Sequence, residues 1–184
     1  TQPVAQIQDA YGNVITSSSA SVTASITANT GAAGSTLSGS TSVSASNGVA
    51  TFNGLSIDRA GAGYTLTFSN SELTSAVTSE FSILSASASA LAFSVQPSGG
   101  TAGDTSALNS TVVITDNLGN VVTDASSDIT LAITSGTGDS SGELLGDATV
   151  TAENGVATFS AVLIEKAALG YTLTAAASLL TSAV

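Results

Sequence analysis

The chain has 184 residues with 13 acidic and only two basic side chains, and its formal net charge at pH 7 is -11. It contains no His, Cys, Met or Trp, so the usual general base, thiol nucleophile and imidazole or thiolate metal ligands are missing. Two cations, Arg59 and Lys166, are too few for the electrostatic attraction that dominates nucleic-acid binding. No apolar run approaches the roughly 20 residues of a membrane-spanning helix. We therefore expect no enzyme, no nucleic-acid partner and no membrane span.

Apolar and polar residues alternate along much of the chain, and this period of two is the pattern of half-buried β-strands. The abundance of Ser and Thr also disfavours helices, because Thr is stiff at the β-carbon and Ser competes for backbone hydrogen bonds. Turn signals separate the alternating stretches, which predicts seven or eight short strands per roughly 100 residues in an antiparallel β-sandwich. In chain order the clearest stretches are Val22–Ile26, Tyr64–Phe68, Ser79–Leu84, Ala90–Val95 and Ile129–Ile133.

Two kinds of turn motif each occur twice. Asn47-Gly48 and Asn154-Gly155 stand between strand-like stretches and predict tight hairpins, because Asn and Gly accept positive backbone dihedral angles. The segments Asp9–Asn13 and Asp116–Asn120 each begin with an Asp whose side chain can cap a turn, and each carries a Gly where a left-handed residue is needed.

The chain aligns with itself without a gap when position n is matched to position n+107, so that Thr1–Val77 overlies Leu108–Val184. A period of this size corresponds to one small domain rather than to a solenoid unit of roughly 20 to 50 residues. The sequence therefore predicts two domains in tandem. The strongest matches pair Asn47–Phe52 with Asn154–Phe159, Gly63–Thr67 with Gly170–Thr174, and Leu73–Val77 with Leu180–Val184.

The repeat also predicts the domain boundaries. We expect the first domain over residues 1–84, a short connection over 85–90 and the second domain over 91–184. Residues 78–107 hold the closing strand of the first domain and the opening strand of the second, and this segment occurs only once. The first domain is therefore expected to lack its first strand, and the second domain its last strand.

A sheet edge left in this way exposes unpaired backbone groups. We expect strands to add to the edges near Val4–Asp9 and Tyr171–Ala175 by β-augmentation. The partners would be adjacent repeats of a longer chain or identical subunits.

One tyrosine near the end of each repeat indicates an immunoglobulin-type sandwich. Tyr64 follows a Gly at the head of a strand and stands two residues before Leu66, and Tyr171 stands likewise before Leu173. An immunoglobulin domain carries its corner tyrosine two residues before a core position.

The ordered motifs resemble the bacterial Ig-like tandem repeats of large surface proteins, the stalk domains of the invasin and intimin type. These motifs are Asp-x-x-Gly-Asn-Val, the approximate Gly-x-Leu of Ser35–Leu37 and Gly142–Leu144, Asn-Gly-Val-Ala-Thr-Phe, and Gly-Tyr-Thr-Leu-Thr. The resemblance covers nearly the whole chain, and only Ala167–Gly170 departs from the Gly-containing form of Ala60–Gly63. It implies tandem immunoglobulin-like antiparallel β-sandwiches, an extracellular, cell-surface or appendage location, a mechanical or adhesive role, and no catalytic residues.

Two further functions stay open beside a structural segment of a fibre, stalk or surface layer. One is an adhesin-type module that binds glycan or protein, and the other is a non-catalytic accessory region of a secreted enzyme. With three Tyr, five Phe and no Trp, the chain has few aromatic rings to stack on sugars.

Acidic residues on loops are the only metal-site candidates, because carboxylates hold calcium in many extracellular arrays. Eight of the 13 acids lie after residue 107. A solvated acidic surface is the simpler explanation of this cluster. If calcium binds, we expect its ligands among Asp104, Asp124, Asp128 and Asp139.

Two other motifs are given no function. Gly138–Gly142 matches the G-x-S-x-G pattern of a nucleophile elbow, but an elbow needs a strand-turn-helix setting and a His. An isopeptide cross-link would need a buried lysine, whereas Lys166 follows Glu165 as Arg59 follows Asp58, which favours an exposed acid-base pair.

Overall fold

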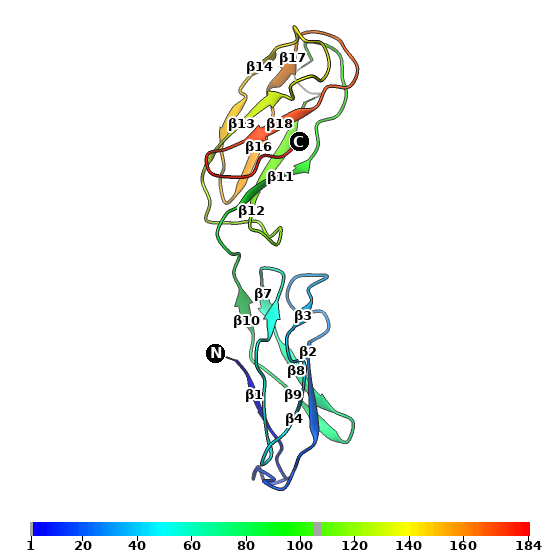
Figure 1. Ribbon diagram of the computed structural model, residues 1–184, viewed down its shortest axis with the longest axis vertical. Helices are drawn as coiled ribbons and strands as arrows, with labels where there is room; N and C mark the ends of the chain where they lie inside the picture. The colour runs from blue at the N-terminus through cyan, green and yellow to red at the C-terminus, as the bar shows by residue number, and fades with distance from the viewer. Residues whose placement is uncertain (1, 105–107) are drawn as a thin grey trace. The chain divides into compact units, whose positions relative to one another are not determined.

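The computed structural model describes residues 2–104 and 108–184, and it contains strands and turns but no helix within those residues (Figure 1). The strands pair in antiparallel fashion, which confirms the all-β class. Among the same residues, no helix has the length and apolar character needed to cross a membrane.

The chain divides into two compact units, Thr1–Leu84 and Ser85–Val184, called unit 1 and unit 2 below. The segment 85–90, expected as a connection, is hydrogen-bonded to unit 2. The Ala86 N–H donates to Asp116 Oδ2 at 3.0 Å, and the Ser89 N–H donates to the Thr115 carbonyl at 2.8 Å. Unit 2 thus begins directly after Leu84.

Unit 1 is built around one four-stranded sheet and three strand pairs. The sheet has the order β4 (Ser42–Ser44), β2 (Ser21–Ile26), β8 (Leu66–Asn70) and β9 (Leu73–Val77). The pairs are β1 (Val4–Gln6) with β5 (Val49–Thr51), β3 (Leu37–Ser38) with β6 (Ser56–Ile57), and β7 (Gly61–Tyr64) with β10 (Phe81–Ile83). The stretch predicted as one strand over Tyr64–Phe68 is split at Thr65, and its two parts pair with different partners.

The described residues of unit 2 form two three-stranded sheets and one strand pair. The sheets have the orders β11 (Ala90–Val95), β12 (Ser110–Thr115), β16 (Val156–Phe159), and β15 (Thr149–Thr151), β13 (Asp128–Ile133), β18 (Leu173–Ala176). The pair is β14 (Leu144–Gly146) with β17 (Val162–Ile164).

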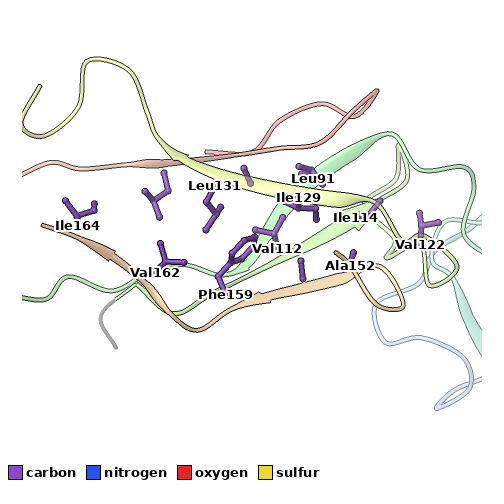
Figure 2. Packing of buried hydrophobic residues seen from close by; sticks show 13 residues of the cluster. Leu91, Val112, Ile114, Val122, Ile129, Leu131, Ala152, Phe159, Val162 and Ile164 are labelled. Carbon is purple, nitrogen blue, oxygen red and sulfur yellow. The ribbon is translucent and has the colours of Figure 1, made fainter. Parts of the chain in front are cut away.

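The predicted alternation decides which side chains form the core. Along β2 and along β13 the second and fourth residues are buried and their neighbours are exposed. Figure 2 shows Ile129 and Leu131 of β13 directed toward the same interior as Val112 of β12 and Phe159 of β16. The two layers of unit 2 therefore bury their apolar faces against each other, as a β-sandwich requires.

The backbone framework recurs at the spacing of 107. Asn47 and Asn154 have φ angles of 51° and 52°, so both Asn-Gly turns adopt the predicted left-handed conformation. The N–H of Ile7 donates to the Gly48 carbonyl at 2.8 Å, and the N–H of Ile114 donates to the Gly155 carbonyl at the same distance.

Threonine hydroxyls join neighbouring strands at equivalent places in both units. Thr27 Oγ1 lies 2.8 Å from Thr67 Oγ1, and Thr134 Oγ1 lies 2.9 Å from Thr174 Oγ1. Cross-strand hydroxyl pairs of this kind stabilise a sheet without using charge.

Candidate functional site

The four candidate calcium ligands lie on different segments of unit 2. Asp104 is in the segment after β11, Asp124 is in the turn after β12, Asp128 begins β13, and Asp139 is in the connection between β13 and β14. Within residues 2–104 and 108–184 no three acidic side chains are grouped so that they could hold a metal ion. Calcium binding stays a prediction without a ligand cluster to support it.

Asp128 and Asp139 accept hydrogen bonds from nearby protein groups. Asp128 Oδ1 accepts a hydrogen bond from the Thr151 hydroxyl. Asp139 Oδ1 accepts hydrogen bonds from the Ser141 hydroxyl at 2.6 Å and the Ser141 N–H at 2.8 Å. These bonds, together with the nearby Lys166 ammonium, hold the pKa of Asp139 below its usual value. Asp139 therefore caps its own turn, and Asp128 joins its strand to β15 through the Thr151 hydroxyl.

Lys166 and the G-x-S-x-G segment are joined by a hydrogen bond, and neither has the surroundings that an isopeptide bond or a nucleophile elbow needs. Lys166 is exposed and its Nζ donates to Ser141 Oγ at 2.8 Å. An isopeptide bond needs a buried lysine, which this one is not. Ser140 and its neighbours lie in the connection between two strands, so the strand-turn-helix setting of a nucleophile elbow is not found there.

The Asp9 and Asp116 turns share their hydrogen bonds but differ in burial. Oδ1 of Asp116 accepts the N–H groups of Leu118 and Asn120, each at 2.9 Å. Its Oδ2 accepts from Asn120 Nδ2 and from the Ala86 N–H, each at 3.0 Å. Asp116 is 3% exposed, whereas Asp9 is exposed at its own turn. Burial raises the pKa of Asp116, but the hydrogen bonds from Asn120, Ala86 and Leu118 outweigh it and lower the pKa to about 2.

We expect Asp116→Asn to lower the free energy of unfolding of unit 2 at pH 7 by about 1–3 kcal/mol. The new amide would direct N–H groups at the donors of Asn120 and Ala86. Because the folded pKa of about 2 lies below the ordinary value of 3.8, the carboxylate stabilises unit 2 above pH 4, and this stabilisation is lost as the pH falls from 4 to 2. Urea unfolding of both proteins across that range should show a weaker pH dependence for the variant.

Asp9→Asn is the matched control for this experiment. Asp9 makes the same bonds to Tyr11 and Asn13, but its side chain is exposed. Its substitution should therefore lower the free energy of unfolding of unit 1 by less. Equal acid sensitivity of the wild type and Asp116→Asn would contradict the assignment.

A groove lies beside each of the two edges that the sequence predicts to be incomplete. The first groove, in unit 1, has a volume of about 460 Å³ and lies between Ala5–Ala10 of the β1 edge and the segment from Phe68 to Ala76. Its floor includes Ile7, Val22 and Phe68, which are 5 to 7% exposed. The expected edge at Val4–Asp9 therefore borders a depression that has apolar side chains at its floor and polar residues along its walls.

The second groove, in unit 2, has a volume of about 630 Å³ and lies between Pro97–Ala102 and Lys166–Tyr171. Ile164 and Leu173, 8 and 5% exposed, also line it. Tyr171 lies on the predicted edge Tyr171–Ala175. The wall at Pro97–Ala102 was not predicted, because this segment has no second copy in the chain.

Aromatic side chains are mostly interior. Phe52, Tyr64, Phe68 and Phe159 are buried, and Tyr11 is 91% exposed at the tip of the Asp9 turn. The position equivalent to Tyr11 in unit 2 is Leu118, 63% exposed. A face with several aromatic rings, as sugar binding favours, is not formed by these residues.

No protein-family model matches this chain, and no curated protein matches it.

Proposed function

We propose that this chain is a structural segment of an extracellular bacterial fibre, stalk or surface layer built from tandem immunoglobulin-like repeats. The observation that carries the proposal is the hydrogen-bond framework that recurs 107 residues apart in two compact units. A series of equal units gives an extended protein its length without requiring a ligand.

The corner tyrosines support the immunoglobulin-like part of the proposal. Tyr64 Oη donates to the Arg59 carbonyl at 2.9 Å, and Tyr171 Oη donates to the Lys166 carbonyl at 3.1 Å. In immunoglobulin-type domains the corner tyrosine likewise bonds to backbone a few residues upstream. The resemblance to invasin- and intimin-type stalk repeats supports the bacterial surface location.

Stretching single molecules tests the mechanical role. We expect two separate unfolding events, each releasing roughly 30 nm of chain, because each unit holds enough residues for that extended length. Antibodies against the chain should label intact cells of the bacterium that makes it. Labelling only after the cells are permeabilised, or extension without unfolding peaks, would contradict the proposal.

A glycan array separates the fibre segment from the adhesin-type alternative. We expect no saturable glycan binding by the 184-residue chain. Saturable binding that is lost in Tyr11→Ala would instead favour an adhesin, since Tyr11 is the strongly exposed aromatic ring among the described residues.

A further inference from the structure

The first groove matches a place that unit 2 fills with β11. There β11 pairs with β12 (Figure 1), and Leu91 lies opposite Ile114. On its other side the Leu91 N–H donates to the Thr181 carbonyl at 2.8 Å, and the Thr181 N–H donates to the Ser89 carbonyl at 3.0 Å. The strand is thus held between two backbone segments.

The equivalents of both flanking segments line the first groove. Ile114 corresponds to Ile7 and Thr181 to Thr74, and both Ile7 and Thr74 border the groove. The groove is therefore unit 1's version of the β11 position, with the same two walls.

The burial of neighbouring residues shows that β11 covers apolar side chains in unit 2. In unit 2, Leu180 and Ala183 pack against the apolar core beside Leu91. Their equivalents in unit 1, Leu73 and Ala76, are exposed, Leu73 by 41%. A strand in the first groove would cover the apolar surface that β11 covers in unit 2.

The second groove matches a place that unit 1 fills with β10. There β10 pairs with β7, Phe81 opposite Tyr64, and the two rings stack with their centroids 6.0 Å apart. Tyr64 is fully buried. Just before β10, Thr78 exchanges hydrogen bonds with the backbone of Leu66, each at 3.0 Å.

The equivalents of the residues that hold β10 and Thr78 in unit 1 line the second groove. Tyr64 corresponds to Tyr171 and Leu66 to Leu173, and both line it. Tyr171 is only partly buried, Leu169 is 96% exposed, and residues 168–171 form no strand although their equivalents form β7. Without a pairing partner, this edge does not become a strand.

We propose that the two grooves are strand-acceptor sites with different specificities. The first takes a strand of the β11 type, with Leu, Phe and Val at alternate positions, and the second takes a strand of the β10 type, with Phe and Ile at alternate positions. The donor is an adjoining repeat of the same kind, a conclusion that rests on the proposed tandem array.

An intact second copy of the chain is a poorer donor. Its own β10 is paired with β7 and its own β11 with β12, so both strands would first have to leave those partners. A strand from an adjoining repeat is held at high effective concentration by the short connection.

Extended chains test the second groove. A further copy of residues 78–84 is joined after Val184, the equivalent of Val77, so that the natural spacing is kept. We expect the unfolding midpoint of unit 2 to rise by roughly 5 to 10 °C, with slower amide exchange at Ala168–Tyr171 and unchanged exchange in unit 1. The matched control carries Phe81→Ser and Ile83→Ser in the added copy only, and it should behave as the unextended chain.

The first groove is tested at the other end. A further copy of residues 85–107 is joined before Thr1, and unit 1 should gain a similar rise in midpoint with slower amide exchange at Val4–Gln8. Its control carries Leu91→Ser and Phe93→Ser in the added copy.

Unchanged midpoints and exchange in both extended chains would overturn the proposal. Protection of both grooves in a stable dimer of the unextended chain would overturn the choice of donor. These readouts do not depend on location or load, so their failure leaves the proposed fibre function intact, and a failure of surface labelling leaves the acceptor sites intact.

Discussion

Phe159→Ala is expected to lower the free energy of unfolding of unit 2 by about 3–5 kcal/mol. Phe159 ends β16 with no exposed surface and packs in a core with Val112, Leu131 and Val162 (Figure 2). Removal of the ring loses apolar burial and leaves a cavity that a closely packed interior fills only in part.

Phe52→Ala is the matched variant in unit 1. Phe52 is equally buried, and its ring centroid lies 5.0 Å from that of Phe68, so an aromatic contact is lost as well. Urea unfolding followed by hydrogen exchange in each unit would measure both variants. Each variant should weaken its own unit and leave the other unchanged. Equal destabilisation of both units by Phe159→Ala would show that they unfold together.

Gly31→Ala is expected to cost unit 1 about 2–4 kcal/mol, through overpacking and a strained backbone. Gly31 has a φ of 67°, and an added Cβ would lie 2.1 Å from the Tyr64 ring. That ring is fully buried and stacks on Phe81, so it has no room to move away.

Gly138→Ala makes the same change in unit 2. Gly138 has a φ of 63°, and its added Cβ would lie 2.1 Å from the Tyr171 ring. Tyr171 is partly exposed beside the second groove, so it can turn away and the cost should be smaller. Thermal unfolding of both variants would show the difference. A larger loss from Gly138→Ala would mean that Tyr171 is held as firmly as Tyr64.

Local patterns in the sequence were sufficient to predict the β-structure. The alternation in β2 and β13 indicates which residues are buried, because neighbouring side chains of a strand lie on opposite faces. The two Asn-Gly turns were predictable because few other residues accept their backbone angles.

Features that depend on distant partners could not be predicted in this way. Gly61–Tyr64 is a strand that pairs with β10, whereas its equivalent at 168–171 is not a strand. Asp9 and Asp116 have the same turn motif, but the Ala86 segment covers only Asp116. The candidate calcium ligands were chosen by residue type, which says nothing about whether they meet.

The threonine pairs between strands bear on the conditions that these units withstand. Hydroxyl groups carry no net charge, so dissolved ions have little to screen at Thr27–Thr67 and Thr134–Thr174. What salt does change is the mutual repulsion of the 13 acidic side chains, which weakens as the ionic strength rises. We therefore expect the strand pairing to persist at low ionic strength, and the free energy of unfolding to rise as the salt concentration increases.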